Sequence, residues 1–172
     1  MGLGQTMMTV LAMGMLATIL LTVNSNSGDN NTAVQMSEYR IMAASLATST
    51  VERATGLAFD ENTVSSDIAG PSSLTSANSL GEEGVEIDSV ENSFDDFDDY
   101  NQFHKWVRGD SAGFRSADFR VWSWVDYVAI SGDSVSHSNT QTYNKRIMVF
   151  VASPYMNDTL RYSTVYSYWK FR

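Results

Sequence analysis

The sequence contains no cysteine, and this absence removes several classes of protein at once. Without thiols there is no disulfide framework, no thiolate metal site and no cysteine nucleophile. An exported protein of this composition must hold its fold by packing and hydrogen bonding. Charged residues are also scarce, at 18% of 172 residues, so solubility depends on Ser, Thr, Asn and Asp. The length allows one domain with an appendage.

The sequence also lacks the motifs of the common enzyme classes. It has no Gly-rich phosphate loop, no nucleophile elbow and no paired-histidine metal motif. Its two histidines, His104 and His137, lie in different segments. Each is better explained as an exposed or hydrogen-bonded side chain than as a metal ligand or a base. We therefore expect no catalytic residues and no enzyme activity.

Basic residues are few and unevenly placed. Residues 1–100 contain fifteen acidic residues but only Arg40 and Arg53, a balance of -13, whereas residues 101–172 have a balance of +4. No dense basic stripe exists, so nucleic acid is not an expected partner. Opposite charges are expected to meet either between copies of the protein or within one folded chain. The candidate contacts join the acidic segment 82–99 to Lys105, Arg108, Arg115, Arg120 or Arg161.

The first part of the chain contains a long apolar run. Residues 1–28 include no charged side chain, and residues 1–23 are dominated by Met, Leu, Val, Ile, Ala and Gly. As a helix, those 23 residues would extend about 35 Å, enough for a hydrocarbon core of about 30 Å. A single helix can cross lipid because its backbone groups satisfy one another. The sequence therefore predicts an apolar membrane or filament-core helix over residues 1–23.

The flanks and the small residues of this helix are unusual for a simple anchor. A secretory signal or single-pass anchor has flanking Lys or Arg, but the first basic residue is Arg40. One explanation is a basic leader removed just before Met1. Gly14, Thr18 and Thr22 recur at every fourth position and would form a ridge on which another helix could pack. A single-pass anchor with tolerated polar residues is the alternative.

This N-terminal pattern resembles that of the type IV pilins and the related pseudopilins of type II secretion. In that family a prepilin peptidase removes a short basic leader, and the new N-terminal residue is methylated. The resemblance implies that Met1 is that residue and that the helix lies in the inner membrane before assembly. Gln5 stands where the family has a glutamate that is thought to meet the terminal amine of a neighbouring subunit. Glutamine can accept a hydrogen bond from that amine but supplies no charge.

Two further segments are similar to pilin sequences. Phe94-Asp-Asp-Phe-Asp-Asp-Tyr-Asn101 looks like the acidic segment that precedes the sheet in some minor pilins and mannose-sensitive-haemagglutinin-type pilins. Lys145-Arg-Ile-Met-Val-Phe-Val-Ala-Ser-Pro154, followed by another strand, resembles the last hairpin of those proteins. The resemblance implies a pilin-like α+β fold.

The acidic segment allows two interpretations. Asp95, Asp96, Asp98 and Asp99 could hold calcium, because hard cations bind several carboxylate oxygens at once. Their spacing does not match an EF-hand loop, and a solvated acidic loop explains the same composition. We expect no other cofactor.

The remaining elements follow from periodicity and turn residues. Residues 24–32 form a breaker cluster, which predicts a true interruption of the helix. A second helix is expected over residues 33–56, with Tyr39, Met42, Leu46, Thr50, Arg53 and Leu57 along one face. Residues 61–100 read as a long surface loop, with a short strand near residues 85–87. Strands are expected over residues 116–131, 142–153 and 159–171, as an antiparallel meander covered by the second helix.

The sequence therefore favours a structural subunit of an extracellular type IV pilus-like filament, which polymerises through its N-terminal helix. Its expected partners are copies of itself, the inner membrane before assembly, the pilus assembly machinery and the prepilin peptidase. Two alternatives remain open. The chain could be a minor pseudopilin of a secretion system, or a single-pass membrane-anchored β-rich module for adhesion or binding.

Overall fold

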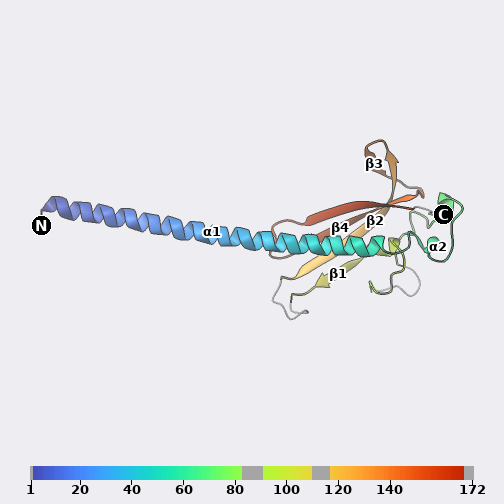
Figure 1. Cartoon of the computed structure of the whole chain (residues 1–172), viewed down its shortest axis with the longest axis horizontal. Helices are drawn as coiled ribbons and strands as arrows, with labels where there is room; N and C mark the ends of the chain where they lie inside the picture. Colours follow the sequence, from blue (N-terminus) through green and yellow to red (C-terminus); the bar gives the residue numbers. More distant parts are fainter. Residues whose placement is uncertain (1, 83–90, 110–116, 169–172) are drawn as a thin grey trace. The chain divides into compact units, whose positions relative to one another are not determined.

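The computed structural model describes residues 2–82, 91–109 and 117–168, apart from the side chains of residues 27–29. Its helices are α1 (Leu3–Thr55) and α2 (Glu61–Val64), with the 3-10 turns η1 (Pro71–Ser73) and η2 (Asp98–Tyr100). Its strands are β1 (His104–Val107), β2 (Phe119–Ser131), β3 (Ser134–His137), β4 (Asn144–Ala152) and β5 (Leu160–Ser167) (Figure 1). A long helix packed on an antiparallel sheet confirms the α+β fold class. The chain divides into two compact units, residues 1–38 and 39–172, which are described separately.

Helix α1 is uninterrupted, and this corrects two expectations. Residues 24–32 are helical rather than a linker, and the predicted helix 33–56 is the last part of α1 rather than a separate element. Asn, Ser, Asp and Gly in a helix interior cost up to about 1 kcal/mol each, but they keep their backbone donors. Only proline would remove a donor, and residues 24–32 contain none. The helix therefore continues through the polar segment.

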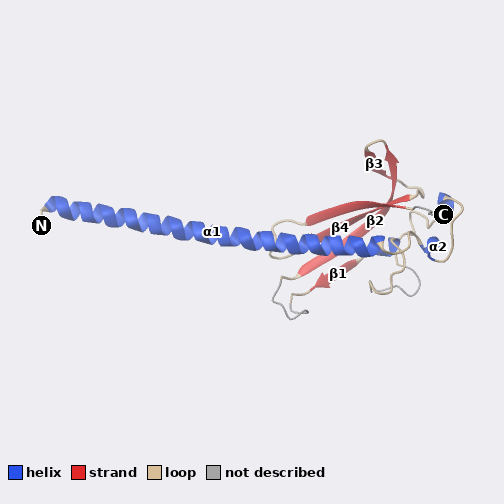
Figure 2. Cartoon of the chain, in the orientation of Figure 1, coloured by secondary structure: helices blue, strands red, loops and turns tan. Residues whose placement is uncertain are grey.

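In the second unit, residues 39–55 of α1 cover one face of the sheet (Figure 2). The buried positions are Ala43, Ala47, Thr50, Val51 and Ala54. Of the predicted stripe, Thr50 is buried and Tyr39, Leu46 and Leu57 pack against the core, whereas Met42 and Arg53 do not belong to the buried face. Met42 is 39% exposed, and the Arg53 side chain is 56% exposed. Because alanines are small, the helix backbone can lie close to the sheet along this face.

The sheet has the strand order β1-β2-β4-β5, and every neighbouring pair is antiparallel. Three of the predicted strands correspond to β2, β4 and β5, and their consecutive pairing confirms the meander. The short strands β1 and β3 were not predicted. Strand β3 forms a hairpin with the end of β2, and Gly132 adopts a φ of 57° in the turn. The predicted strand at residues 85–87 lies outside the described residues.

The two faces of the sheet differ in burial. Along β2, Phe119, Val121 and Val125 are buried, whereas Trp122 and Trp124 lie on the opposite face. Strand β4 alternates in the same way, with the buried residues Ile147, Val149 and Val151. This alternation places the core between the sheet and α1 and leaves an outer face.

The last part of the acidic region is buried rather than solvated, whereas most residues of 61–82 are exposed or half-buried. In its described part, Leu74 is buried against Phe59 and Tyr127. Phe97 and Tyr100 are buried in the main core. The aromatic residues at every third position from residue 94 to residue 100 are buried in the core, and Asp96, Asp98 and Asp99 between them are buried as well, whereas Asp95 is exposed.

Candidate functional site

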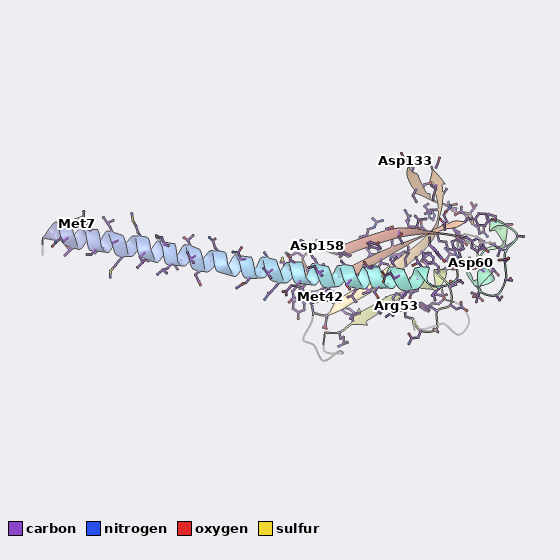
Figure 3. The ribbon with its side chains drawn as sticks, in the orientation of Figure 1. Met7, Met42, Arg53, Asp60, Asp133 and Asp158 are labelled. Atoms are coloured by element: carbon purple, nitrogen blue, oxygen red, sulfur yellow. The ribbon has the colours of Figure 1, made fainter. Side chains whose placement is uncertain are left out.

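Residues 3–23 of α1 carry large apolar side chains around the whole helix. Those more than half exposed are Leu3, Met7, Met8, Val10, Leu11, Met13, Met15, Leu16, Ile19, Leu20, Leu21 and Val23. Figure 3 shows side chains pointing away from the helix on both sides of its axis, with Met7 near the start. By length and composition, α1 is the one helix in the described part of the chain that could cross a membrane. A helix that is apolar on all sides needs lipid or other helices around it.

The threonine hydroxyl groups of this segment are satisfied within the helix. Thr6 donates to the carbonyl of Leu3 at 2.9 Å. Thr18 donates to the carbonyl of Met15 at 2.8 Å, and Thr22 donates to that of Thr18 at 2.9 Å. Burying a hydroxyl in an apolar medium is costly only when it lacks a partner. These residues therefore leave the segment compatible with an apolar environment.

The residues predicted for assembly lie on this helix. Gly14, Thr18 and Thr22 are all exposed, and at 3.6 residues per turn they fall within about 80° of one another. A Cβ atom added to Gly14 would meet nothing within 4 Å beyond its chain neighbours and the adjacent helix backbone, so the fold of the single chain does not require glycine there. Gln5 is exposed in the first turns of α1, and Met1 lies outside the described residues.

A second candidate site lies under the sheet, around the ammonium group of Lys145. This side chain is fully buried, and its Nζ donates to the backbone carbonyl of Phe59 at 2.8 Å. Nζ also donates to Oδ2 of Asp60 at 2.7 Å and to Oδ1 of Asp98. It lies 4.7 Å from the ring centroid of Phe59 and 5.2 Å from that of Tyr127. Lys145 thus joins the segment after α1 to η2 in a place that excludes water.

Sequence analysis missed this lysine, although a signal was present. Residues 147, 149 and 151 of β4 are apolar and buried, and Lys145 has the same parity. A lysine in register with core positions must either reach the edge of the sheet or meet carboxylates inside it. Here it meets carboxylates.

Asp60 is held as a carboxylate by several donors. Burial raises the pKa of the carboxyl, but the charge and hydrogen bond of Lys145, together with the backbone N–H groups of Thr75 and Asn62, outweigh that effect and hold the pKa below its usual value. The backbone N–H of Thr75 donates to Oδ1 at 3.0 Å, and that of Asn62 donates to the same oxygen at 3.2 Å. The hydroxyl of Tyr127 lies 3.1 Å from Oδ2.

The aspartates of η2 and its flank do not converge on one cation. Oδ1 of Asp96 accepts the backbone N–H of Asp98 at 2.7 Å, and Oδ2 of Asp99 accepts that of Asp96 at 3.1 Å. Asp98 binds Lys145, and Asp95 is exposed. Within residues 2–82, 91–109 and 117–168, no group of three or more His, Cys, Asp or Glu side chains is placed to hold a metal ion. The structure therefore does not assemble the predicted calcium site, and Lys145 supplies the cation for Asp98.

The carboxyl of Asp96 is strongly perturbed by its environment. Burial, together with the charges of Asp98 and Asp99, raises the pKa of the Asp96 carboxyl to about 9. A carboxyl with a raised pKa stabilises the fold fully below its unfolded pKa, and it loses that contribution as the pH rises toward the folded value. We expect Asp96→Asn to raise the free energy of unfolding at pH 8 by about 1–3 kcal/mol, because the amide is neutral and keeps the acceptor oxygen. Urea titrations of the full chain in detergent from pH 4 to pH 9 would measure the free energy of unfolding of the variant and of the parent protein.

The neighbouring Asp95 offers a matched control for this substitution. Its side chain is exposed, so Asp95→Asn is expected to change the free energy of unfolding by less than about 0.5 kcal/mol at any pH. An Asp96→Asn variant that loses stability at pH 8, or that retains the pH profile of the parent protein, would contradict the assignment of a neutral Asp96.

Several opposite charges meet within one chain, which is one of the two arrangements that the charge distribution allows; the other is contact between copies of the protein. Glu91 pairs with Lys105 at 2.6 Å and with Arg53 at 2.9 Å. The guanidinium groups of Arg120 and Arg161 lie over aromatic rings of the outer sheet face, at 5.4 and 5.7 Å from the ring centroids. Arg115 lies outside the described residues. Glu91 and Asp98 therefore form ion pairs with basic residues of the same chain, and these acidic residues contribute to the fold of one subunit.

The outer face of the sheet is aromatic. Trp122 and Phe150 are stacked across β2 and β4, with their ring centroids 5.4 Å apart. Trp106 on β1 is 59% exposed and Trp124 on β2 is 48% exposed.

The two histidines are separate from each other. His104 is exposed, and the ring of His137 bonds Asp126 at 2.9 Å, a hydrogen bond that raises the pKa of His137.

Taken together, a long apolar N-terminal helix and a C-terminal antiparallel sheet packed on that helix form an architecture consistent with pilin-like proteins. Comparisons with protein-family models, with curated proteins and with solved structures found no match to this chain.

Proposed function

We propose that this protein is a structural subunit of an extracellular type IV pilus-like filament, and that it polymerises through residues 3–23 of α1. The observation that carries the proposal is the apolar surface of this segment, which has no cover within the described chain. Each large apolar side chain left in water forgoes about 1.5–3 kcal/mol. A segment with twelve such side chains therefore needs an apolar environment at every stage.

Two environments meet this need in turn. Before assembly, the segment lies in the inner membrane, which its length and composition allow. After assembly, equivalent segments of other copies surround it, and the ridge of Gly14, Thr18 and Thr22 permits close approach. The pilus assembly machinery and the prepilin peptidase are the proposed partners in this transfer. Gln5 offers its carbonyl to a neighbouring subunit.

The proposal is tested by shearing surface filaments from cells that produce the full chain. We expect electron microscopy to show thin filaments and mass spectrometry to show this chain as their main component. A chain that stays entirely in the membrane fraction, with no filaments in the sheared fraction, would overturn the proposal. A chain present at a few copies per filament would instead indicate a minor pilin or pseudopilin.

An anchored adhesion or binding module is a second candidate, and one observation favours it. Trp106 and Trp124 are large, exposed and located on the outer sheet face, where no described element covers them. Exposed indoles are frequent at binding surfaces. In this case the chain would remain single in the membrane. The shearing experiment separates the two candidates, because an anchored module leaves no filaments.

A further inference from the structure

We propose that the folded chain joins Lys145 to Asp98 by an intramolecular amide bond, so that the pair is a self-modification site. The observation behind this is a lysine with no exposed side-chain surface, in direct contact with a carboxyl group that is almost equally buried, at 2%. A second and a third aspartate lie beside the pair. The inference does not depend on the proposed function.

The geometry brings the two reacting groups together before any reaction. Nζ of Lys145 contacts Oδ1 of Asp98, and this oxygen is bonded to the carboxyl carbon that the nitrogen would attack. Groups held in this way react with effective molarities of about 10⁵–10⁸ M, because their translational and rotational freedom is already lost. Phe59 and Tyr127 enclose the nitrogen and keep water away from it. The same exclusion protects the product from hydrolysis.

The reaction is a condensation and needs no external reagent. The ammonium group of Lys145 gives one proton to the carboxylate of Asp98, which yields a neutral amine and a carboxylic acid. The amine attacks the carboxyl carbon, and a C–N bond forms. A second proton passes from nitrogen to one hydroxyl of the tetrahedral intermediate, the C–O bond breaks, and one water molecule leaves. Ammonium and carboxylate thus become amide and water, with no change of oxidation state.

Asp96 and Asp60 are placed to move these protons. Asp96 is hydrogen-bonded to the carboxyl of Asp98, and burial, with the charges of Asp98 and Asp99, raises the pKa of Asp96 to about 9. It is therefore a neutral acid that can polarise the Asp98 carbonyl. Asp60 lies 2.7 Å from Nζ, and Lys145 lowers the pKa of Asp60 against the opposing effect of burial, so this carboxylate can accept the proton of the nitrogen. Two neighbouring carboxyl groups with opposite pKa shifts form an acid and base pair.

The same contacts select Asp98 over Asp60 as the carboxyl that reacts. Backbone N–H groups of Asn62 and Thr75 donate to Asp60 and stabilise its anion, which is a poor electrophile. Asp98 is buried, which raises its pKa, and Asp96 is hydrogen-bonded to it. Burial outweighs the lowering effects of Lys145 and of the Asp96 hydrogen bond, so the pKa of Asp98 is raised while that of Asp60 is lowered, and Asp98 is the carboxyl more readily protonated and attacked.

The bond would tie β4 to η2 across 47 positions of the sequence. A covalent link over a long loop restricts the unfolded chain, as a disulfide does. In a chain without cysteine, an amide would provide that restriction without thiol chemistry.

Mass spectrometry of the full chain tests the proposal directly. We expect the denatured protein to be lighter than its sequence mass by about 18 Da, one water molecule. Trypsin is then expected not to cleave after Lys145, and residues 121–146 should appear covalently joined to residues 54–105. A denatured chain of full sequence mass, cleaved normally after Lys145, would overturn the proposal.

Two variants exclude other sources of water loss. Lys145→Arg is expected to restore the full mass, whereas Lys105→Arg, at a lysine that pairs with Glu91, is expected to keep the loss. A loss that persists in Lys145→Arg would come from succinimide formation at an aspartate and would count against the amide. Asp60→Asn is expected to slow the loss of water from newly synthesised chain at least about tenfold, because general-base assistance contributes about 10²–10⁴-fold.

Discussion

Replacing Lys145 with methionine is expected to lower the free energy of unfolding by about 3–5 kcal/mol at pH 8. Methionine fills a similar volume, but it leaves the carboxyl groups of Asp60 and Asp98 without their cation. Both are almost fully buried, so water cannot replace the lost contact. Where the amide has formed, the substitution instead removes the covalent link and leaves Asp98 as a free buried carboxyl group, so a loss of stability is again expected.

The loss is expected to shrink at low pH. In the variant, the two buried carboxyl groups have no cation, so their pKa values in the folded state rise above those in the unfolded chain. A raised pKa gives stability that is present below the unfolded pKa and disappears as the pH increases. The variant therefore recovers relative to the parent protein between pH 8 and pH 5. Urea titrations of the full chain in detergent, followed by tryptophan fluorescence, would measure both points.

An exposed ion pair serves as the control for this substitution. Arg40 pairs with Asp158 at 3.2 Å, and both side chains are 57% exposed. Arg40→Met is expected to cost less than about 1 kcal/mol, since exposed pairs are screened by solvent. Equal losses from Lys145→Met and Arg40→Met would contradict the idea that burial makes the Lys145 contacts valuable.

The sequence predicts the sheet well because alternation is a local property. The regular placing of apolar residues along β2 and β4 is visible in the sequence, and antiparallel pairing of consecutive strands requires only short turns. Strands β1 and β3 escape prediction since each has four residues and little alternation. The uninterrupted α1 escapes prediction for another reason. Polar residues lower helix propensity without preventing a helix, and only proline blocks one locally.

The buried acidic cluster could not be derived from sequence spacing. Asp60, Asp98 and Lys145 are far apart in the sequence and meet only after the chain folds. A run of aspartates usually marks a solvated face. In this chain the aromatic residues between the aspartates supply the burial, and Lys145 supplies the charge. Sequence analysis identified the acidic segment but left two interpretations open, a calcium site and a solvated loop, and it did not identify Lys145 as the cation.

Replacing Gly14 with leucine is expected to abolish filament formation while leaving the chain in the membrane. Leucine adds bulk to the ridge of Gly14, Thr18 and Thr22, where the proposed function places a neighbouring helix. It adds no polarity, so insertion into lipid is retained. Apart from its chain neighbours and the adjacent helix backbone, no atom of the described chain lies within 4 Å of the position that the new Cβ would occupy, and the single subunit can therefore accept the side chain. We expect the amount of chain in sheared filaments to fall about tenfold or more, and the amount in the membrane fraction to stay unchanged.

Ala12→Leu provides the matched control, because it adds similar bulk about 120° around the helix from the centre of the ridge. Ala12 is also exposed in α1, so the two variants differ chiefly in the side of the helix that they enlarge. Filaments that form with Ala12→Leu and fail with Gly14→Leu would indicate close helix contact along the ridge. Normal filaments with Gly14→Leu would exclude the ridge as a contact, even in a chain that polymerises. Loss of filaments in both variants would indicate that other helices pack closely on both sides of this helix and not only along the ridge. A densely packed interior is destabilised by added side-chain volume at any position.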